Sequence, residues 1–193
     1  MANIKFSQFN TAVNDSDIDY LVGYKGADNV KIDKATLGIG PTPYMMTGVF
    51  TNMFGGDPGG NNRDVLDWVG SSPASSHSSA LPILQNCKIT AAGFKWISST
   101  PPTIGAGQSW TVNVYKLNNP LTDSTTADAN FTLVGALNIT LTQADSGIAV
   151  GKFSSGLNLI LNAGDIIRIA GDETGTIGTT TEEAQLTVLF EPI

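Results

Sequence analysis

The sequence has little of what most active sites and nucleic-acid surfaces are built from. Its 193 residues include one cysteine and one histidine, and 10 lysines and arginines stand against 17 aspartates and glutamates. A single cysteine excludes an internal disulfide. The apolar context of Cys87 predicts a buried small hydrophobic residue and not a reactive thiol. The net charge of −7, without any basic cluster, argues against nucleic acid and against an anionic membrane surface as partners.

Long apolar runs are also absent. No window approaches the ~18 apolar residues that a membrane-spanning helix needs. Residues 1–10 contain a lysine but no apolar stretch of the kind found in signal peptides. We therefore expect a protein that is made in the cytoplasm and either stays soluble or leaves inside a larger particle.

Metal and catalytic motifs are incomplete wherever they begin. Asp15, Asp17 and Asp19 have the spacing of the first calcium-loop ligands, but the sixth position is Tyr20 and the twelfth is Gly26, so a solvated turn is favoured. The one histidine, His77, lies in a serine-rich stretch without a Gly-x-Ser-x-Gly elbow. Acidic residues that would serve glycoside hydrolysis lie mostly in predicted loops, and sequence spacing pairs none of them. The sequence thus predicts no catalytic residue, no metal and no cofactor.

The three tryptophans are the aromatic side chains that a sugar ring would stack on. Trp96 and Trp110 lie in alternating segments, where a core or interface tryptophan is the ordinary outcome. Trp68 follows Asp67 next to a loop, and it is the one tryptophan we consider for ligand contact.

The residue pattern of the chain changes near residue 45. Before it, the chain is polar and rich in turn residues. Asp15 and Asp17 favour the cap of a short helical turn that leads into Tyr20 and Leu21, and residues 30–33 alternate like a short strand. The glycine–proline segment 38–43 supports neither a helix nor a strand ladder. We therefore divide the chain into a mostly irregular N-terminal arm, residues 1–40, and a body, residues 44–193.

The body has the pattern of an all-β domain. Short segments of alternating or apolar residues are separated by turn-rich stretches, as in a β-sandwich. The expected strands lie within residues 44–50, 65–69, 81–89, 91–98, 110–117, 131–141, 148–161, 166–170 and 184–190. In the clearest of them, Trp110, Val112 and Val114 share one face. About eight strands in a domain of this size favour a β-sandwich of the jelly-roll type.

One segment of the body has little polar alternation. Residues 166–169 read Ile-Ile-Arg-Ile, which is typical of a strand covered on both faces. We expect the opposing sheet to cover one face and a neighbouring subunit to cover the other. The residues predicted for this oligomer interface are Ile167, Ile169, Val188 and Phe190.

The arm carries a family resemblance. The stretches Phe6-Ser7-Gln8-Phe9, Asp17 to Tyr24 and Asn29-Val30-Lys31-Ile32 resemble the N-terminal segment of phage structural proteins, particularly tail-fibre and head-decoration proteins of marine and bacteroidete phages. The segment 161–169 also resembles a hairpin of trimeric jelly-roll heads. The resemblance implies a virion protein, associated as a homotrimer, whose arm attaches it to capsid or tail proteins. The implied attachment residues are Phe6, Phe9, Tyr20, Tyr24 and Lys31.

Three functions follow as hypotheses. The first is a structural component of a phage virion, a head decoration or fibre displayed outward. The second is the tip of a tail fibre that binds a receptor or glycan on the host surface through the loops at 55–62, 71–79, 118–130 and 174–181. The third, from a different class, is a carbohydrate-active enzyme, for which the chain lacks the length and the repeats of a depolymerase. The first predicts a protein without enzymatic activity.

Overall fold

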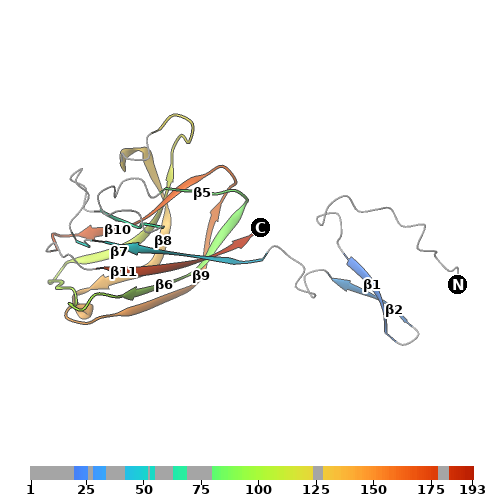
Figure 1. Ribbon diagram of the computed structural model, residues 1–193, viewed down its shortest axis with the longest axis horizontal. Coiled ribbons are helices and arrows are strands. Elements are labelled where there is room, and N and C mark those ends of the chain that lie inside the picture. The colour runs from blue at the N-terminus through green and yellow to red at the C-terminus, as the bar shows by residue number, and fades with distance from the viewer. Residues whose placement is uncertain are drawn as a thin grey trace. The chain divides into compact units, whose positions relative to one another are not determined.

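The computed structural model describes residues 20–25, 28–33, 42–51, 53–54, 63–68, 80–123, 128–177 and 183–193, with the backbone alone for 20–25, 28–33 and 63. The chain divides into two compact units, Met1–Pro41 and Thr42–Ile193 (Figure 1). The residues from Asp15 to Asp19 and His77 lie outside the described residues, as do Phe6 and Phe9. Each unit is described by itself below.

The described part of the first unit is a β-hairpin. Strand β1 (Tyr20–Lys25) pairs antiparallel with β2 (Asp28–Asp33), from Tyr20 opposite Asp33 to Lys25 opposite Asp28. The short strand predicted at residues 30–33 is confirmed. The helical turn predicted to lead into Tyr20 and Leu21 is wrong at these two residues, because β-branched and aromatic side chains between 20 and 24 favour a strand.

The second unit, the body, is a sandwich of two antiparallel sheets (Figure 1). One sheet has the order β3-β11-β6-β9, and the other has the order β4-β10-β7-β8 with β5 also paired to β10. The bounds are β3 Tyr44–Phe50, β4 Arg63–Val65, β5 Leu81–Pro82, β6 Cys87–Trp96, β7 Ser109–Leu117, β8 Phe131–Thr142, β9 Gly151–Leu161, β10 Ile166–Thr174 and β11 Ala184–Pro192. Two single turns of 3-10 helix, η5 Asp128–Asn130 and η6 Gln143–Asp145, stand in the connections.

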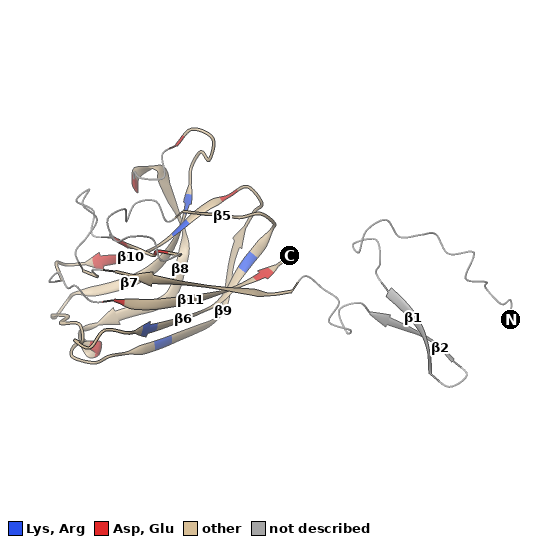
Figure 2. Ribbon diagram, in the orientation of Figure 1, with Lys and Arg blue, Asp and Glu red and all other residues tan. Residues whose placement is uncertain are grey.

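This strand order is that of a jelly roll, so the predicted fold class is confirmed. If β4 and β5 are counted as two parts of one strand, the sheets contain the first, eighth, third and sixth strands and the second, seventh, fourth and fifth. Each sheet thus combines strands from both ends of the body, as happens when an antiparallel ribbon winds into two packed sheets. The strands are mostly tan in Figure 2, because charged residues are few and stand mainly near strand ends.

The space between the sheets holds the main core. Side chains alternate across each strand, and Trp110, Val112 and Val114 of β7 all face inward with no exposed surface. Trp96 is also a core residue at 1% exposure, and Cys87 is fully buried as a free thiol. The predictions for these residues are confirmed. Burial raises the pKa of the Cys87 thiol above its ordinary value, so the thiolate is disfavoured.

The four residues predicted to form an oligomer interface are core residues. Ile167, Ile169, Val188 and Phe190 have no exposed surface in the single chain and belong to the core between the sheets. Their own chain encloses them, so they offer no surface to a partner. The sequence prediction of an interface at these positions is therefore wrong, and its physical reason is the alternation that turns these side chains inward.

A second buried cluster lies on the outer face of the β4-β10-β7-β8 sheet. This outer-face cluster consists of Val65, Tyr115, Leu117, Phe131 and Ala170. Arg168 of β10 lies beside it, 1% exposed, with its guanidinium carbon 4.1 Å from the centre of the Phe131 ring. Nη1 of Arg168 donates a hydrogen bond to Oδ1 of Asp128. Both faces of β10 are covered here as predicted, but this chain itself supplies the outer cover.

Candidate functional site

The connections between strands gather at two ends of the body. We call the end at which β3, β6, β8 and β10 finish the distal loop end; its described connecting residues are 51, 53–54, 97–108, 143–150, 175–177 and 183. At the opposite, proximal loop end the described connecting residues are 83–86, 118–123, 128–130 and 162–165. Thr42, where the body begins, and the last residue, Ile193, both belong to the proximal end, since β3 starts there and β11 finishes there. The distal end is therefore the part of the body farthest along the strands from the point where the chain enters.

Hydrogen bonds join the connections of the distal loop end to one another. The N–H groups of Ile97 and Ser98 donate to the carbonyl of Glu183, at 3.1 and 3.3 Å. In return, the Glu183 N–H donates to Ser98 Oγ at 2.6 Å. A third connection joins them where the Gly147 N–H donates to the Pro102 carbonyl at 2.8 Å. In the described part of this end, hydrogen bonds thus connect the loops to one another. We call this arrangement cross-braced, in contrast to a set of independent loops.

An ion pair anchors η6 at the same end. Lys152 Nζ lies 2.9 Å from Oδ1 of Asp145, and Oδ2 of Asp145 accepts a hydrogen bond from the Thr142 N–H at 2.9 Å. Partial burial alone would raise the pKa of Asp145, but the bonds from Lys152 and Thr142 outweigh it and the pKa lies below its ordinary value. The carboxylate therefore stays ionised and holds the connection in place at neutral pH.

The pKa of Glu173, near the end of β10, is shifted in the direction opposite to that of Asp145. Its Oε2 accepts a hydrogen bond from the Ile177 N–H at 3.2 Å, while its buried Oε1 has no hydrogen-bond partner among the described residues. Burial raises the pKa of this carboxyl, and the Ile177 N–H offsets that effect in part. The folded body therefore binds the proton of Glu173 more tightly than the unfolded chain does.

Replacing Glu173 with glutamine should stabilise the body at neutral and alkaline pH. Because the folded-state pKa is raised, the wild type loses stability as pH rises through that pKa, whereas the glutamine variant does not. We expect a higher melting temperature for Glu173→Gln at pH 8 and equal melting temperatures below about pH 4, where the acid is protonated in both states. Thermal melts at both pH values measure this. A variant that melts lower at pH 8 would show that the carboxylate is needed in its charged form.

The proximal loop end contains a groove beside the edge of the sandwich. Its volume is about 400 Å³, and Tyr44 and Met46 of β3 line it opposite residues 81–85. The Tyr44 ring stacks on Phe190 with ring centres 5.1 Å apart, and burial with the neighbouring Cys87 raises the pKa of the Tyr44 phenol to about 12. The tyrosine is therefore a neutral, apolar wall of the groove.

Trp68 lies close to this region but is not an exposed stacking platform. It is half-buried, its ring centre stands 6.5 Å from that of Phe190, and its Nε1 has no hydrogen-bond partner within the described part of the chain. The ligand contact considered for this tryptophan stays a prediction.

The predicted attachment residues occupy the first unit. Tyr20 and Tyr24 stand opposite Asp33 and Asn29, and Lys31 stands opposite Val22, so all three belong to the hairpin of β1 and β2. Phe6 and Phe9 lie outside the described residues. The structure thus brings three of the five into one small element and leaves their role in attachment a prediction.

The four loops proposed for ligand recognition fall only in part on described residues. The segments 55–62 and 71–79 lie outside the described residues, as do 124–127 and 178–181. Of the remainder, residues 174–177 stand at the distal end, and residues 118–123 and 128–130 stand at the proximal end. A recognition surface formed by these loops stays a prediction.

Other kinds of site were sought in the described residues. They contain no group of three or more histidine, cysteine, aspartate or glutamate side chains placed to hold a metal ion. Nor do they include a helix long and apolar enough to cross a membrane.

Comparisons with known proteins give structural neighbours only. No protein-family model matches the chain, and a search of curated proteins finds no match. Among solved structures, the acid-stable capsid of Helicobacter pylori bacteriophage KHP30 is 13% identical, with 78% of this chain and 89% of that chain covered, at a TM-score of 0.37. The structure of infectious bursal disease virus, strain Gx, is 10% identical, with 88% of this chain and 36% of that chain covered, at a TM-score of 0.35. The structure of Desmodium yellow mottle tymovirus is 11% identical, with 100% of this chain and 97% of that chain covered, at a TM-score of 0.25. With TM-scores below 0.5, these similarities decide neither the fold nor the function of this chain.

Proposed function

We propose that the protein is a structural component of a phage virion, a head decoration or head fibre, anchored by its first unit and displaying its jelly-roll body outward. The proposal rests on two observations: the chain is divided into two units, and the second unit has two opposite loop ends, of which only one receives the chain from the first unit. The chain enters the body at the proximal loop end, so anchoring by residues 1–41 leaves the cross-braced distal end free to face the surroundings. Jelly rolls are recurrent in viral capsid proteins, and the resemblance of the arm to phage structural proteins points the same way.

The partners in this proposal are other virion proteins, either of the capsid or of the tail. The hairpin that carries Tyr20, Tyr24 and Lys31 is the proposed contact, because a two-stranded hairpin is only marginally stable by itself in water and gains stability from a surface that covers it. The homotrimeric state, which the resemblance implies, remains a prediction, and the core position of Ile167 and Phe190 removes the interface that was predicted for an oligomer.

Removing residues 1–41 should separate folding from attachment. We expect the truncated chain to fold with a melting temperature close to that of the full chain, because the body has its own core and could fold alone. The same truncation should abolish incorporation into particles, measured by immunoblotting of purified virions. A truncated chain that aggregates would place the first unit within the core of the fold, and a truncated chain that still incorporates would contradict anchoring by the arm.

Single substitutions in the hairpin test the same contact more finely. Tyr20→Ala and Tyr24→Ala should reduce incorporation, because truncating an aromatic anchor at an interface costs on the order of 2 kcal/mol or more of binding. The melting temperature of the body should not change. A matched control is Leu121→Ala in the body, since Leu121 is 94% exposed and lies in the proximal connection 118–130. Equal losses of incorporation in all three variants would argue against a specific role for the tyrosines.

A second candidate is a tip that binds a receptor or glycan on the host surface. It is favoured by the described residues 175–177 and 183, which lie at the distal end with the connections 97–108 and 143–150, because loops placed by a rigid scaffold are frequent binding surfaces. Binding on a glycan array, lost when the distal connections are shortened, would support this candidate. No binding would favour a purely structural role.

We propose further that the protein is not an enzyme. The proposal rests on the incomplete catalytic motifs of the sequence. Turnover of a host polysaccharide that disappears when a single carboxylate of the body is replaced would contradict it and revive the carbohydrate-active alternative.

A further inference from the structure

The chain that leaves β10 is held to the body by two side chains. Oε2 of Glu173 accepts a hydrogen bond from the Ile177 N–H at 3.2 Å and so closes residues 173–177 into a turn. Gln108, just before β7, donates from its Nε2 to the Thr176 carbonyl. We call residues 173–177 the β10 turn. Of the two groups that hold it, the Glu173 carboxyl titrates and the Gln108 amide does not.

Ile177 is the part of the β10 turn that enters the core. It is 2% exposed and belongs to the core between the sheets, whereas Thr174, Gly175 and Thr176 are exposed. Gly175 has a φ of +74°, a left-handed conformation that glycine adopts without strain. The turn is therefore an exposed stretch with a glycine at its centre, closed by the Glu173 carboxyl and by a buried isoleucine.

The surroundings of the Glu173 carboxyl favour its neutral form. Alternation along β10 places Glu173 on the same face as the core residue Ile169, and the register places it opposite Trp110. Its buried Oε1 has no hydrogen-bond partner among the described residues, and no described lysine or arginine forms an ion pair with it. An ionised carboxylate needs several hydrogen bonds or a cation to offset its loss of hydration, and the closed turn offers one N–H.

The strands and the connection packed against Glu173 do not compensate a negative charge there. Asp64 of β4 accepts a hydrogen bond from Trp110 Nε1 at 2.6 Å, and a negative charge on Asp64 would disfavour ionisation of Glu173, as burial does. The one charged residue of β7, Lys116, stands near the proximal end and pairs with Asp165. The connection 97–108 contains no charged residue.

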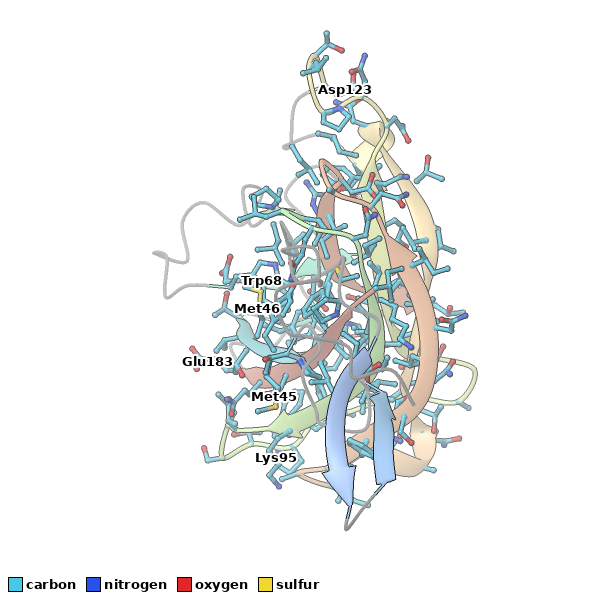
Figure 3. All side chains as sticks on the ribbon, turned by 90° about the vertical axis from the view of Figure 1, so that its right-hand side faces the viewer. Met45, Met46, Trp68, Lys95, Asp123 and Glu183 are labelled. Atoms are coloured by element: carbon cyan, nitrogen blue, oxygen red, sulfur yellow. The ribbon has the colours of Figure 1, made fainter. Side chains whose placement is uncertain are left out.

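The other charged residues near this end have different surroundings. Asp172 lies on the outer face, where Asn113 Nδ2 donates to its Oδ2 at 2.6 Å, and the register places Arg63 opposite it. Lys95 of β6 and Glu183 before β11 are exposed, and Figure 3 shows both at the surface of the body. The ionisation of Glu173 is thus opposed by burial and is supported by one hydrogen bond from the turn itself.

We infer that the β10 turn is a pH-sensitive latch, which is closed while Glu173 is protonated and opens when Glu173 ionises. Opening withdraws Ile177 from the core and admits water to the carboxylate, and Gly175 takes up the change in backbone direction. The ladder between β10 and β7 extends to the pair of Thr174 with Ser109. The opening is therefore confined to the residues beyond this pair, and it changes the surface of the distal loop end. This inference does not depend on the proposed function.

The direction of the pH dependence follows from the linkage between protonation and closure. Burial raises the pKa of Glu173 in the closed turn, and an opened turn returns it toward that of an exposed glutamate, about 4.3. The closed turn is therefore most stable below that ordinary pKa, and its stability is lost as pH rises through the raised, closed-state pKa. Each unit by which the two pKa values differ raises the ratio of open to closed turns about tenfold at neutral pH.

A cysteine in place of Ile177 reports the opening of the turn. We expect Ile177→Cys to react with a dipyridyl disulfide reagent faster in the wild-type background than in the Glu173→Gln background, because glutamine stays neutral at every pH. The ratio of the two rates should rise about tenfold between about pH 4 and about pH 7, and the ionisation of the thiol itself cancels in this ratio. The native Cys87 is fully buried and should stay unlabelled.

The matched control for the labelling is Ile104→Cys. Ile104 is also 2% exposed and belongs to the same core, but it lies in the connection 97–108, so its ratio should not change with pH. A constant ratio for Ile177→Cys would overturn the inference, because Glu173 would then not control the turn. An equal rise for Ile104→Cys, or labelling of Cys87, would overturn it as well, because the opening would not be confined to the β10 turn.

Hydrogen exchange measures the same opening in the native chain. The protection factor of the Ile177 amide should fall about tenfold between about pH 4 and about pH 7 in the wild type and stay constant in Glu173→Gln. Gln108→Ala should lower it by the same factor at both pH values, because the lost amide does not titrate. Asp145→Asn, which changes another partly buried carboxyl of the distal loop end, should leave the wild-type pH dependence in place. A wild-type protection factor that is constant or rises with pH would contradict the latch.

Discussion

Replacing Gly171 with alanine should destabilise the body more than any other change of a single methyl group described here. A Cβ at this position would stand 2.0 Å from Cε2 and Cζ2 of Trp110 and 2.3 Å from its Nε1. The indole cannot easily move aside, because its Nε1 donates to Asp64 Oδ2 at 2.6 Å and its ring packs edge-on against Phe50 at 5.0 Å between centres. We expect a loss of about 3 kcal/mol or more in the free energy of unfolding, measured by urea denaturation.

Two further variants show whether the indole is the cause. Gly93→Ala, in a strand of the other sheet, places a Cβ no nearer than 4.0 Å to any atom, so it should leave stability unchanged or raise it by up to about 1 kcal/mol. In a Trp110→Phe background, Gly171→Ala should cost less than in the wild type, because the atoms that the Cβ meets are removed. Additive losses in the double variant would mean that the clash lies elsewhere.

Breaking the buried ion pair should have an effect of similar size. Arg168 and Asp128 are 1% and 9% exposed, and Arg168 also lies over Phe131. Asp128→Asn removes the compensating charge and leaves the guanidinium buried beside a neutral amide. We expect a loss of about 3–5 kcal/mol in the free energy of unfolding, the cost typical of removing one partner of a buried pair.

A more exposed ion pair serves as the control for the effect of burial. Lys88 Nζ and Glu191 Oε2 are 3.3 Å apart with about a third of each side chain exposed, so Glu191→Gln should cost less than about 1 kcal/mol. Replacing both buried partners, with Arg168→Met and Asp128→Leu together, should recover much of the loss because no uncompensated charge remains. If the double variant is as unstable as Asp128→Asn, the pair stabilises the body through its geometry more than through its charge.

The strand pattern predicted much of the fold, and its limits have physical causes. Residues 44–50, 110–117 and 184–190 alternate clearly, and the strands found there, β3, β7 and β11, match or slightly exceed these ranges. The segments 81–89 and 91–98 were expected as two strands with a break near residue 90. The chain breaks earlier, between β5 and β6, because residues 83–86 connect one sheet to the other. Apolar content alone does not tell a strand from such a crossing.

The candidate site was less predictable than the fold. The sequence of residues 166–169 indicated a strand covered on both faces, which is correct, but it gave no sign that Asp128, 40 positions earlier, supplies part of the cover. Likewise, nothing in the sequence indicated that residues 44–50 form an edge strand that Asp67 bridges at Val49. Sheet order depends on long-range pairing, so a pattern read along the chain does not contain it.

The divided edge strand has a consequence for how this protein tolerates change. β4 and β5 both pair with β10, and the Leu66 N–H bonds to the Ile169 carbonyl while Leu81 stands opposite Ile167. One residue of β10, Arg168, therefore lies between two attachment points that are separated by residues 67–80 on the other side. Leu66 and Leu81 are held to β10 independently of each other, so the number of residues between them is not coupled to the register of the sheet. The cost of loop closure rises by only about 0.6 kcal/mol for each doubling of length. Natural variants should differ in length here first, and a foreign peptide inserted between 70 and 79 should leave the sandwich intact.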